Sequence, residues 1–258
     1  MIKPDGQIPS LKPYLKKEPF AKWLSLTKET TEFLTLIELF NSIPIEWVIY
    51  IERNIEKVKK RGIIIRDPLS YRLSCLWNGI VLSEESKFIT DTLETALRQI
   101  FCDKLITIGR NREYLVNTIP LLERGFKEVL IEKNNEVNSR DISKLSFYQI
   151  HETIGRNWNY IVSLYGSEGF KEYFLSKKRL YSSVFNKNMK YCRQQRNNIV
   201  HFRKLITPCE LNSLYSIVNG WLTPLSVDLK QRVLKFRKKR PKFLEPLAKV
   251  SHGSYPPV

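Results

Sequence analysis

Residues 189–206 have the sequence MKYCRQQRNNIVHFRKLI, and this segment carries most of the information about the fold. On a helix at about 100° per residue, its polar side chains gather on one arc of roughly 160°. That arc holds Arg193, Arg196, Asn197, His201, Arg203 and Lys204. The opposite arc holds Tyr191, Cys192, Ile199, Phe202 and Ile206. The pattern predicts one amphipathic helix over about residues 182–206, with a core face and a basic face.

The basic face contains a six-residue motif, Arg196-Asn197-Asn198-Ile199-Val200-His201. His201 is one of three histidines in the chain, and a histidine can both take and give a proton near neutral pH. Arg196 is a permanent cation whose planar fork matches a phosphate. A base for the 2'-hydroxyl and a cation for the phosphate are the minimum equipment for cutting RNA without a metal.

This motif resembles the Arg-polar-x3-His signature of HEPN domains, which are all-helical and often metal-independent ribonucleases. The resemblance implies an all-α, HEPN-type helical bundle. Arg196 and His201 would lie about 140° apart on one helix, so they do not face each other. HEPN nucleases are thought to pair two motif helices across a dimer interface. One motif per chain therefore implies a homodimer with a composite site.

The resemblance also implies roles for individual residues. His201 would be the general base or acid, Arg196 would neutralise the scissile phosphate, and Asn197 would orient either group. Flanking phosphates would be held by Lys190, Arg193, Arg203 and Lys204. The competing interpretation is structural: a solvated helix face whose histidine only caps the helix or forms a hydrogen bond.

The net charge of +17 is concentrated in the last third of the chain. From residue 171 onward there are 19 Lys and Arg against 4 Asp and Glu, whereas the first 170 residues carry 24 against 22. A concentrated basic region indicates a polyanionic partner. RNA is favoured over a membrane surface, because aromatic residues that could stack on unpaired bases are interleaved with the charges. These are Tyr173, Phe174, Tyr181, Phe185 and Tyr191, for which core packing is the alternative.

No metal site or cofactor is expected from the sequence. The four cysteines, at positions 75, 102, 192 and 209, are scattered, and the three histidines show no metal-ligand spacing. No run of 18 apolar residues indicates a membrane span, and the N-terminal residues contain no apolar stretch of signal-peptide type. We therefore expect a cytoplasmic protein with reduced thiols and no membrane partner.

The chain is expected to have three parts: an N-terminal arm and helical region (1–80), a HEPN-like helical bundle (81–240) and a flexible Pro-containing tail (241–258). Caps and periodicity predict helix starts at Thr27 or Thr30, after Pro44, at Ser83, near Asp141 and at Thr207-Pro208. Further helices are predicted for residues 112–133 and 227–239, and Gly62 should end the helix after Pro44. The Ile63–Ile65 run is read as a brief strand or a buried connector.

A second resemblance comes from DPLSYRLSCLW, residues 67–77, which follows a lysine-rich helix and an Arg-Gly-aliphatic run. This region is similar to the N-terminal part of Abi-type abortive-infection proteins, which also carry a HEPN-type motif near the C-terminus. The two resemblances together predict a toxin or phage-defence effector that cuts RNA. Such an effector could have an antitoxin or an activating partner. The alternative is a non-catalytic RNA-binding or scaffold protein, or a subunit of a ribonucleoprotein complex.

Overall fold

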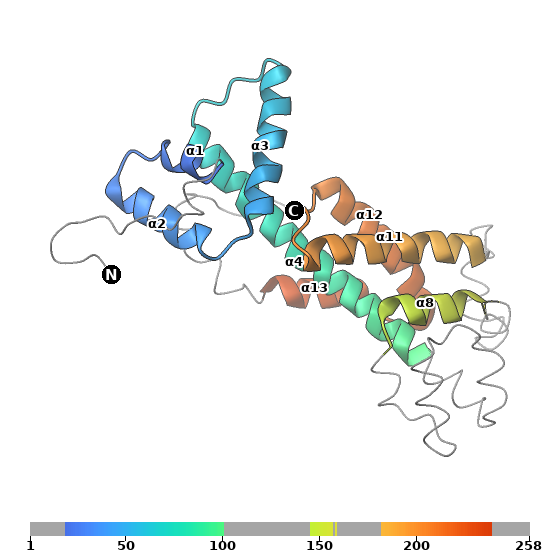
Figure 1. Cartoon of the computed structure of the whole chain (residues 1–258). Helices are drawn as coiled ribbons and strands as arrows, with labels where there is room; N and C mark the ends of the chain where they lie inside the picture. The colour runs from blue at the N-terminus through green and yellow to red at the C-terminus, as the bar shows by residue number, and fades with distance from the viewer. Residues whose placement is uncertain (1–18, 101–144, 157, 159–181, 239–258) are drawn as a thin grey trace, which may run out of the picture. The chain divides into compact units, whose positions relative to one another are not determined.

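The structure is a computed structural model, and it describes residues 19–100, 145–156, 158 and 182–238. Within these ranges 81% of the residues are helical and none lies in a strand (Figure 1). The described part of the chain is therefore all-α, as the sequence predicts. The extended N-terminal arm predicted for about the first 25 residues lies mostly outside the described residues, but its last part is helical, at Phe20–Leu24, so the prediction is wrong there. The helix of residues 112–133, the start near Asp141 and the tail after residue 240 lie outside the described residues.

Figure 1 labels the helices in chain order. They are α1 (Phe20–Leu24), α2 (Thr30–Phe40), α3 (Ile45–Lys60), α4 (Pro68–Ile100), α8 (Phe147–Arg156), α11 (Ser182–Val200), α12 (Pro208–Leu222), the 3-10 turn η4 (Thr223–Leu225) and α13 (Leu229–Lys238). No single described helix is long and apolar enough to span a membrane. Only α2 and α3 taken together reach that length and composition, and they are bent by 118° at the break between them.

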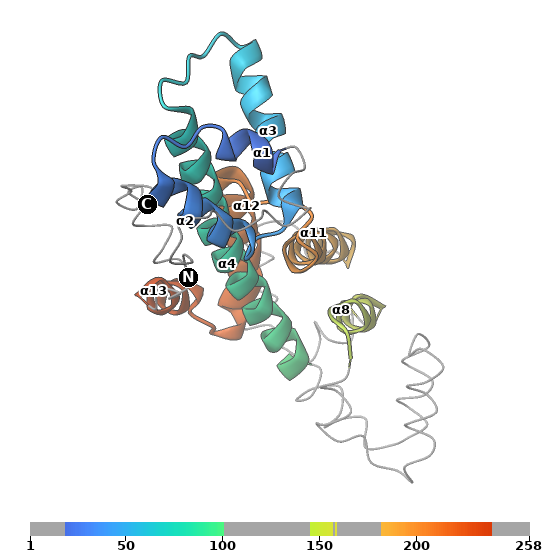
Figure 2. The ribbon, with the colours of Figure 1, turned by 60° about the vertical axis from the view of Figure 1, so that its left-hand side comes forward.

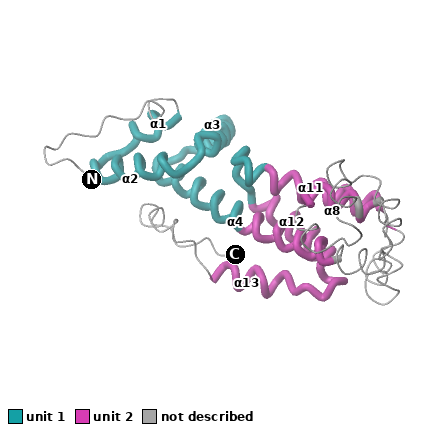
Figure 3. The backbone as a smooth tube through the Cα atoms, turned by 60° about the horizontal axis from the view of Figure 1, so that its bottom comes forward, with its two compact units in different colours: residues 1–84, 198–207, 239–258 teal, residues 85–197, 208–238 magenta. Residues whose placement is uncertain are grey.

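The described residues divide into two compact units, which Figure 3 distinguishes by colour. Unit 1 contains the chain up to Glu84 and residues 198–207. Unit 2 contains residues 85–197 and 208–238. The division falls inside α4 and again three residues before the end of α11. Each unit therefore has its own packing.

Unit 1 is built on an apolar core to which α1, α2, α3 and the first half of α4 contribute, and Figure 2 shows these helices lying together. The rings of Phe20 and Trp23 pack on Phe40, with centroids 4.4 and 5.7 Å apart. Helix α3 places its buried residues three or four positions apart: Trp47, Val48, Ile51, Glu52 and Ile55. Leu205 joins the same core, so the segment after α11 is anchored in unit 1.

A buried ionic cluster ties α3 to α1 and α4. The Glu52 carboxylate accepts hydrogen bonds from Arg72 Nε (2.6 Å), Arg72 Nη2 (3.1 Å) and Trp23 Nε1 (2.8 Å). Lys22 Nζ lies 2.8 Å from the same carboxylate, and Arg72 Nη1 donates to the Pro68 carbonyl. Burial raises the pKa of Glu52, but the hydrogen bonds from Arg72, Lys22 and Trp23 outweigh it and leave the pKa below the usual value.

Unit 2 is packed around aromatic side chains. The Trp158 and Phe185 rings stack at 4.9 Å, and Trp221 of α12 meets both edge-on, at 5.7 and 5.1 Å. Phe185 is therefore a core residue and not a platform for bases. Helix α13 is held on α4 by stacking of Phe236 on Phe88 at 4.6 Å. A two-point ion pair between Arg237 and buried Glu85 secures the same contact.

Most of the predicted helix boundaries in the described ranges are confirmed. Helix α2 begins at Thr30, α3 follows Pro44, and α12 begins at Pro208 after Thr207. Gly62 ends α3 in the left-handed region, with φ of 77°. The Ile63–Ile65 run forms no strand, and Ile63 and Ile64 are exposed.

The predicted helix start at Ser83 is wrong, because α4 runs without a break from Pro68 to Ile100. The residues that resemble an acidic first turn lie in the middle of this helix, and two of them are bound by other parts of the chain. Ser83 Oγ accepts a hydrogen bond from the Ile206 backbone N–H, and Glu85 pairs with Arg237. Buried partners thus explain polar residues that the local pattern assigns to a helix cap.

Candidate functional site

Helix α11 carries the motif, and its apolar side chains explain why it forms. Phe185, Met189, Cys192 and Ile199 are buried at helical spacing, while Lys190 is exposed. Burial raises the pKa of the Cys192 thiol to about 12, so this cysteine is not a candidate nucleophile. The functional candidates are therefore the polar residues at the C-terminal end of the helix.

The helix ends at Val200, so the prediction of one helix through residue 206 is wrong beyond that point. The Phe202 N–H donates to the Ile199 carbonyl (3.0 Å) and the Arg203 N–H to the Asn198 carbonyl (2.8 Å). These two bonds form a Schellman motif, in which the residue after the C-cap adopts a left-handed conformation. Phe202 has that conformation, with φ of 52°, and His201 is the C-cap.

His201, Phe202 and Arg203 form an exposed turn, hereafter the His201 turn. Among the described residues, neither the His201 ring nor the Arg203 guanidinium has a hydrogen-bond or ion-pair partner. Lys204 is half-buried and has an interaction partner. Of the predicted site residues, the structure therefore places His201, Arg203 and Lys204 next to one another in unit 1.

The His201 turn is fixed from both sides. Before it lies the Schellman motif. After it, Leu205 is buried so closely against Gly79 of α4 that a Cβ at Gly79 would lie 2.6 Å from Leu205 Cδ1. The Ile206 N–H then donates to Ser83 Oγ at 3.2 Å. A polar turn between such anchors has a defined backbone, which favours a functional role for its exposed side chains.

The Phe202 ring rests against Trp47 of α3. The two rings meet edge-on with centroids 5.6 Å apart, and Phe202 is 48% exposed whereas Trp47 is 8% exposed. The Trp47 Nε1–H is buried without a hydrogen-bond partner among the described residues. The helical pattern assigns Phe202 to the core face. That assignment is wrong, because the helix ends before this residue.

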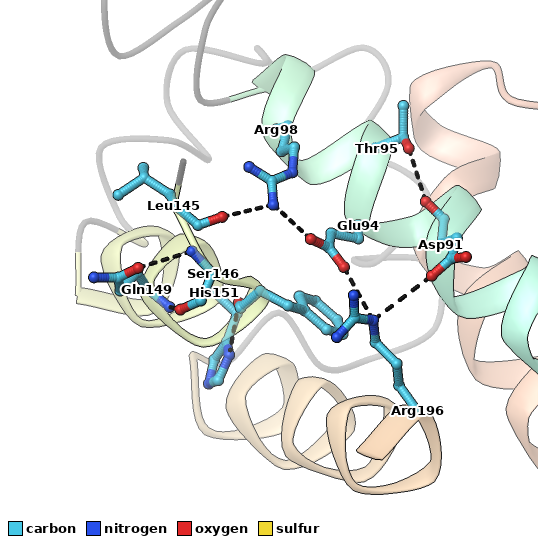
Figure 4. A network of polar contacts seen from close by, with 10 residues as sticks. Asp91, Glu94, Thr95, Arg98, Leu145, Ser146, Gln149, His151 and Arg196 are labelled. Carbon is cyan, nitrogen blue, oxygen red and sulfur yellow. Dashed lines mark hydrogen bonds and ion pairs between the residues drawn. The ribbon is translucent and has the colours of Figure 1, made fainter. Parts of the chain in front are cut away.

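Arg196 and Asn197 lie on the other side of the division, in unit 2, where Arg196 is engaged by carboxylates (Figure 4). Arg196 Nε is 3.3 Å from Glu94 Oε2 and 3.6 Å from Asp91 Oδ1. Neither contact is a hydrogen bond, so the buried Nε–H has no acceptor among the described residues. Both carboxylates lie on α4, about 100 residues away in sequence, and the motif itself gives no sign of them.

Glu94 also binds a second arginine. Arg98 Nη2 contacts Glu94 Oε1 and donates to the Leu145 carbonyl at 2.6 Å (Figure 4). The positive charges of Arg98 and Arg196 are therefore balanced by the two carboxylates of Asp91 and Glu94. The charge of Arg196 is already compensated within unit 2, and this disfavours its predicted role of neutralising a phosphate.

The remaining predicted residues of α11 also lie in unit 2. Arg193 places its guanidinium carbon 4.4 Å from the centre of the exposed Tyr148 ring, a cation–π contact. Lys190 is exposed and Asn197 is half-buried. The structure thus separates the predicted set into an exposed turn in unit 1 and a helical group in unit 2.

His151 is the other histidine within the described ranges, and it is 2% exposed. Its Nδ1 lies 3.3 Å from the Phe147 carbonyl, and its Nε2 lies 3.3 Å from Glu152 Oε1. Burial lowers the pKa of His151, with Arg193 adding to the effect and Glu152 opposing it. Its burial disfavours a role with a large substrate. His252 lies outside the described residues.

Within the described ranges, no three His, Cys, Asp or Glu side chains are grouped so that they could hold a metal ion. The chain matches no protein-family model, no curated protein and no solved structure. The HEPN and Abi resemblances therefore rest on the motif residues alone.

Proposed function

We propose that this chain is a metal-independent RNA endonuclease of the HEPN type, with His201 as its general acid or base. The observation that carries the proposal is the His201 turn. It presents an imidazole to solvent, beside the exposed cation of Arg203, on a backbone anchored at both ends. His201 caps α11 through its backbone alone, because its ring has no hydrogen-bond or ion-pair partner among the described residues and is left available for a substrate.

In the proposed reaction, neutral His201 removes the proton from a ribose 2'-hydroxyl. The oxygen attacks the adjacent phosphorus, and the bond from phosphorus to the 5'-oxygen breaks. A protonated acid then supplies a proton to that 5'-oxygen. The products carry a 2',3'-cyclic phosphate and a 5'-hydroxyl. Arg203 would hold a neighbouring phosphate, since arginine binds phosphate oxygens in a two-point geometry.

The roles predicted for Arg196 and Asn197, the homodimer and the defence function belong to this proposal as predictions. Arg196 can act on a phosphate only if Asp91 and Glu94 release it. Replacing Asp91 by Asn should then leave cleavage unchanged or increase it. A dimeric site predicts that the specific rate of cleavage falls on dilution.

The test compares RNA cleavage by the wild type, His201→Ala and Arg61→Ala, in buffer containing EDTA. Arg61 is a matched control because it is the exposed C-cap of α3, in the same backbone motif as His201. We expect His201→Ala to lower the rate by at least about 100-fold, the usual scale for a general acid or base. Arg61→Ala should cut at the wild-type rate, and both variants should melt as the wild type does.

Cleavage by His201→Ala at the wild-type rate would remove His201 from the mechanism. Loss of wild-type cleavage in EDTA, with recovery on adding Mg²⁺, would contradict the metal-independent chemistry. The products should be checked for the cyclic phosphate, because a 5'-phosphate product would require a different reaction.

A second candidate, non-catalytic RNA binding, is favoured by the ion pairs of Arg196. A guanidinium already neutralised by two carboxylates suits a structural role better than a role in the transition state. In that case no purified RNA would be cut, and His201→Ala would weaken RNA binding no more than other single substitutions of basic residues. Nearly complete loss of activity at His201 alone favours the enzyme.

A further inference from the structure

Phe202 occupies a backbone position that ordinarily belongs to glycine. Its φ of 52° lies in the left-handed region, at the residue that follows the C-cap in a Schellman motif. A bulky residue in this conformation is an outlier that persists only where its surroundings enforce it. Glycine at this position would relieve the strain, so the aromatic side chain requires a separate explanation.

The partner of Phe202 is not arranged for stability either. Trp47 is buried, yet its Nε1–H has no acceptor among the described residues. A buried donor without an acceptor destabilises the folded state. The pair therefore combines a strained backbone at Phe202 with an unsatisfied donor at Trp47, and neither feature stabilises unit 1.

The surroundings of the Phe202 ring match one kind of ligand. The ring is 48% exposed and is supported by the buried Trp47 ring, so it forms a rigid apolar platform. The residues on either side in sequence are the exposed His201 and Arg203. An aromatic ring beside a cation is the arrangement that takes one unpaired base by stacking and the adjoining phosphate by charge.

We propose that Phe202 is a specificity residue, on which the protein stacks one unpaired base of a single-stranded RNA. Trp47 holds the ring in place, and Arg203 binds the phosphate of the same or the next nucleotide. The inference rests on the proposed action on RNA and adds a substrate requirement to it. A nucleotide must be unpaired to reach the ring, so double-stranded RNA should be a poor ligand at this turn.

The test measures binding by fluorescence anisotropy with the full chain and two labelled decamers. One is 2'-O-methyl adenosine RNA, and the other is the same backbone without bases. The two carry equal charge, and neither has a 2'-hydroxyl to be cut. The wild type should bind the base-bearing decamer about tenfold more tightly than the abasic one.

Phe202→Leu keeps an apolar side chain and the same backbone strain but removes the aromatic face. It should lose most of the tenfold preference, while its affinity for the abasic decamer stays unchanged. Phe202→Trp should keep the preference. Ile64→Ala is the matched control, because Ile64 is also an exposed apolar residue of unit 1, and it should keep the preference. Thermal melting of every variant checks that it is folded.

A folded Phe202→Leu variant that keeps the preference would overturn the inference. An equal loss of affinity for both decamers would overturn it as well, because the effect would not depend on the base. If Phe202→Leu instead lowers the oligomeric state without changing the preference, Phe202 belongs to a protein interface. The decamers cannot be cut, so a base preference that depends on Phe202 would stand even if His201 proved not to be catalytic. Failure of the wild type to bind either decamer would contradict both proposals.

Discussion

Two helix ends in unit 1, those of α3 and α11, have the same backbone motif with different residues in its left-handed position. Helix α3 ends at Lys60, and the residue after its C-cap is Gly62, whose N–H donates to the Lys59 carbonyl at 2.9 Å and whose φ is 77°. The end of α11 has the same bonds and a φ of 52° at Phe202. A Cβ at Gly62 would meet nothing within 4 Å, so there is space for a side chain. Glycine is favoured at this position because of the left-handed backbone conformation alone. Glycine therefore adopts this conformation without strain, whereas the end of α11 has Phe202 in the same position.

This difference indicates which of the two ends is built for more than a change of chain direction. After Gly62 the chain continues into exposed residues, and the motif is satisfied by the backbone alone. At Phe202 the left-handed conformation of a non-glycine residue costs about 1–2 kcal/mol. A strained residue flanked by an exposed histidine and an exposed arginine is the pattern expected of a functional turn.

The largest effect should come from disrupting the buried ionic cluster around Glu52, which ties the helices of unit 1 together. Glu52→Gln removes the carboxylate that satisfies Arg72, which is 2% exposed, and leaves a buried cation without compensation. We expect the free energy of unfolding of unit 1 to fall by about 3–5 kcal/mol. Glu56→Gln, on the exposed face of the same helix, should change it by less than about 0.5 kcal/mol. Urea denaturation followed by tryptophan fluorescence measures both changes. Equal effects of the two substitutions would show that the ionic cluster does not stabilise unit 1.

The same ionic cluster should make the stability of unit 1 depend on pH. The pKa of Glu52 is below its ordinary value of 4.5 in the folded chain, so the stabilisation is fully present above that pH. It is lost as the pH falls through the folded-state pKa, because the unfolded state then binds the proton more readily. Between about pH 6 and about pH 3, stability should fall more steeply for the wild type than for Glu52→Gln. Parallel curves would mean that other carboxylates dominate acid unfolding.

A smaller effect is expected from making the two helix ends more alike. Gly62→Ala puts a Cβ on a residue with φ of 77° and should destabilise unit 1 by about 1 kcal/mol. Nothing lies within 4 Å of that Cβ, so the loss measures backbone strain alone. An unchanged free energy of unfolding would show that a left-handed C-terminal residue costs little in this fold. The left-handed conformation of Phe202 would then cost little as well and would not indicate a functional role.

The sequence predicts the helices whose signals are local. Pro44, Thr207-Pro208 and Gly62 mark boundaries through caps and fixed dihedral angles, and the structure agrees with them. The sequence does not predict the end of α11, because a phenylalanine does not indicate a left-handed backbone conformation. The false start at Ser83 has a related cause: buried polar residues whose partners lie far away in sequence imitate a helix cap.

The candidate site shows the same limit. His201 and Arg203 are found from the motif and the charge pattern, and the structure exposes both. The carboxylates at Arg196 come from α4 and leave no trace in residues 189–206. Phe202 is assigned to the core by helical periodicity, which holds only while the helix continues. An aromatic residue one position after a histidine at a helix end is the signal that could have marked it.

The most direct test of the strained helix end is Phe202→Gly, with stability and RNA binding measured on the same preparation. Glycine relieves about 1 kcal/mol of backbone strain and loses ring contacts on the order of 1 kcal/mol, so the free energy of unfolding should stay near that of the wild type. The tenfold preference for the base-bearing decamer over the abasic one should disappear. A fall in stability of about 2 kcal/mol or more, with the preference intact, would show that Phe202 serves the fold and would contradict its assignment as a base-stacking residue.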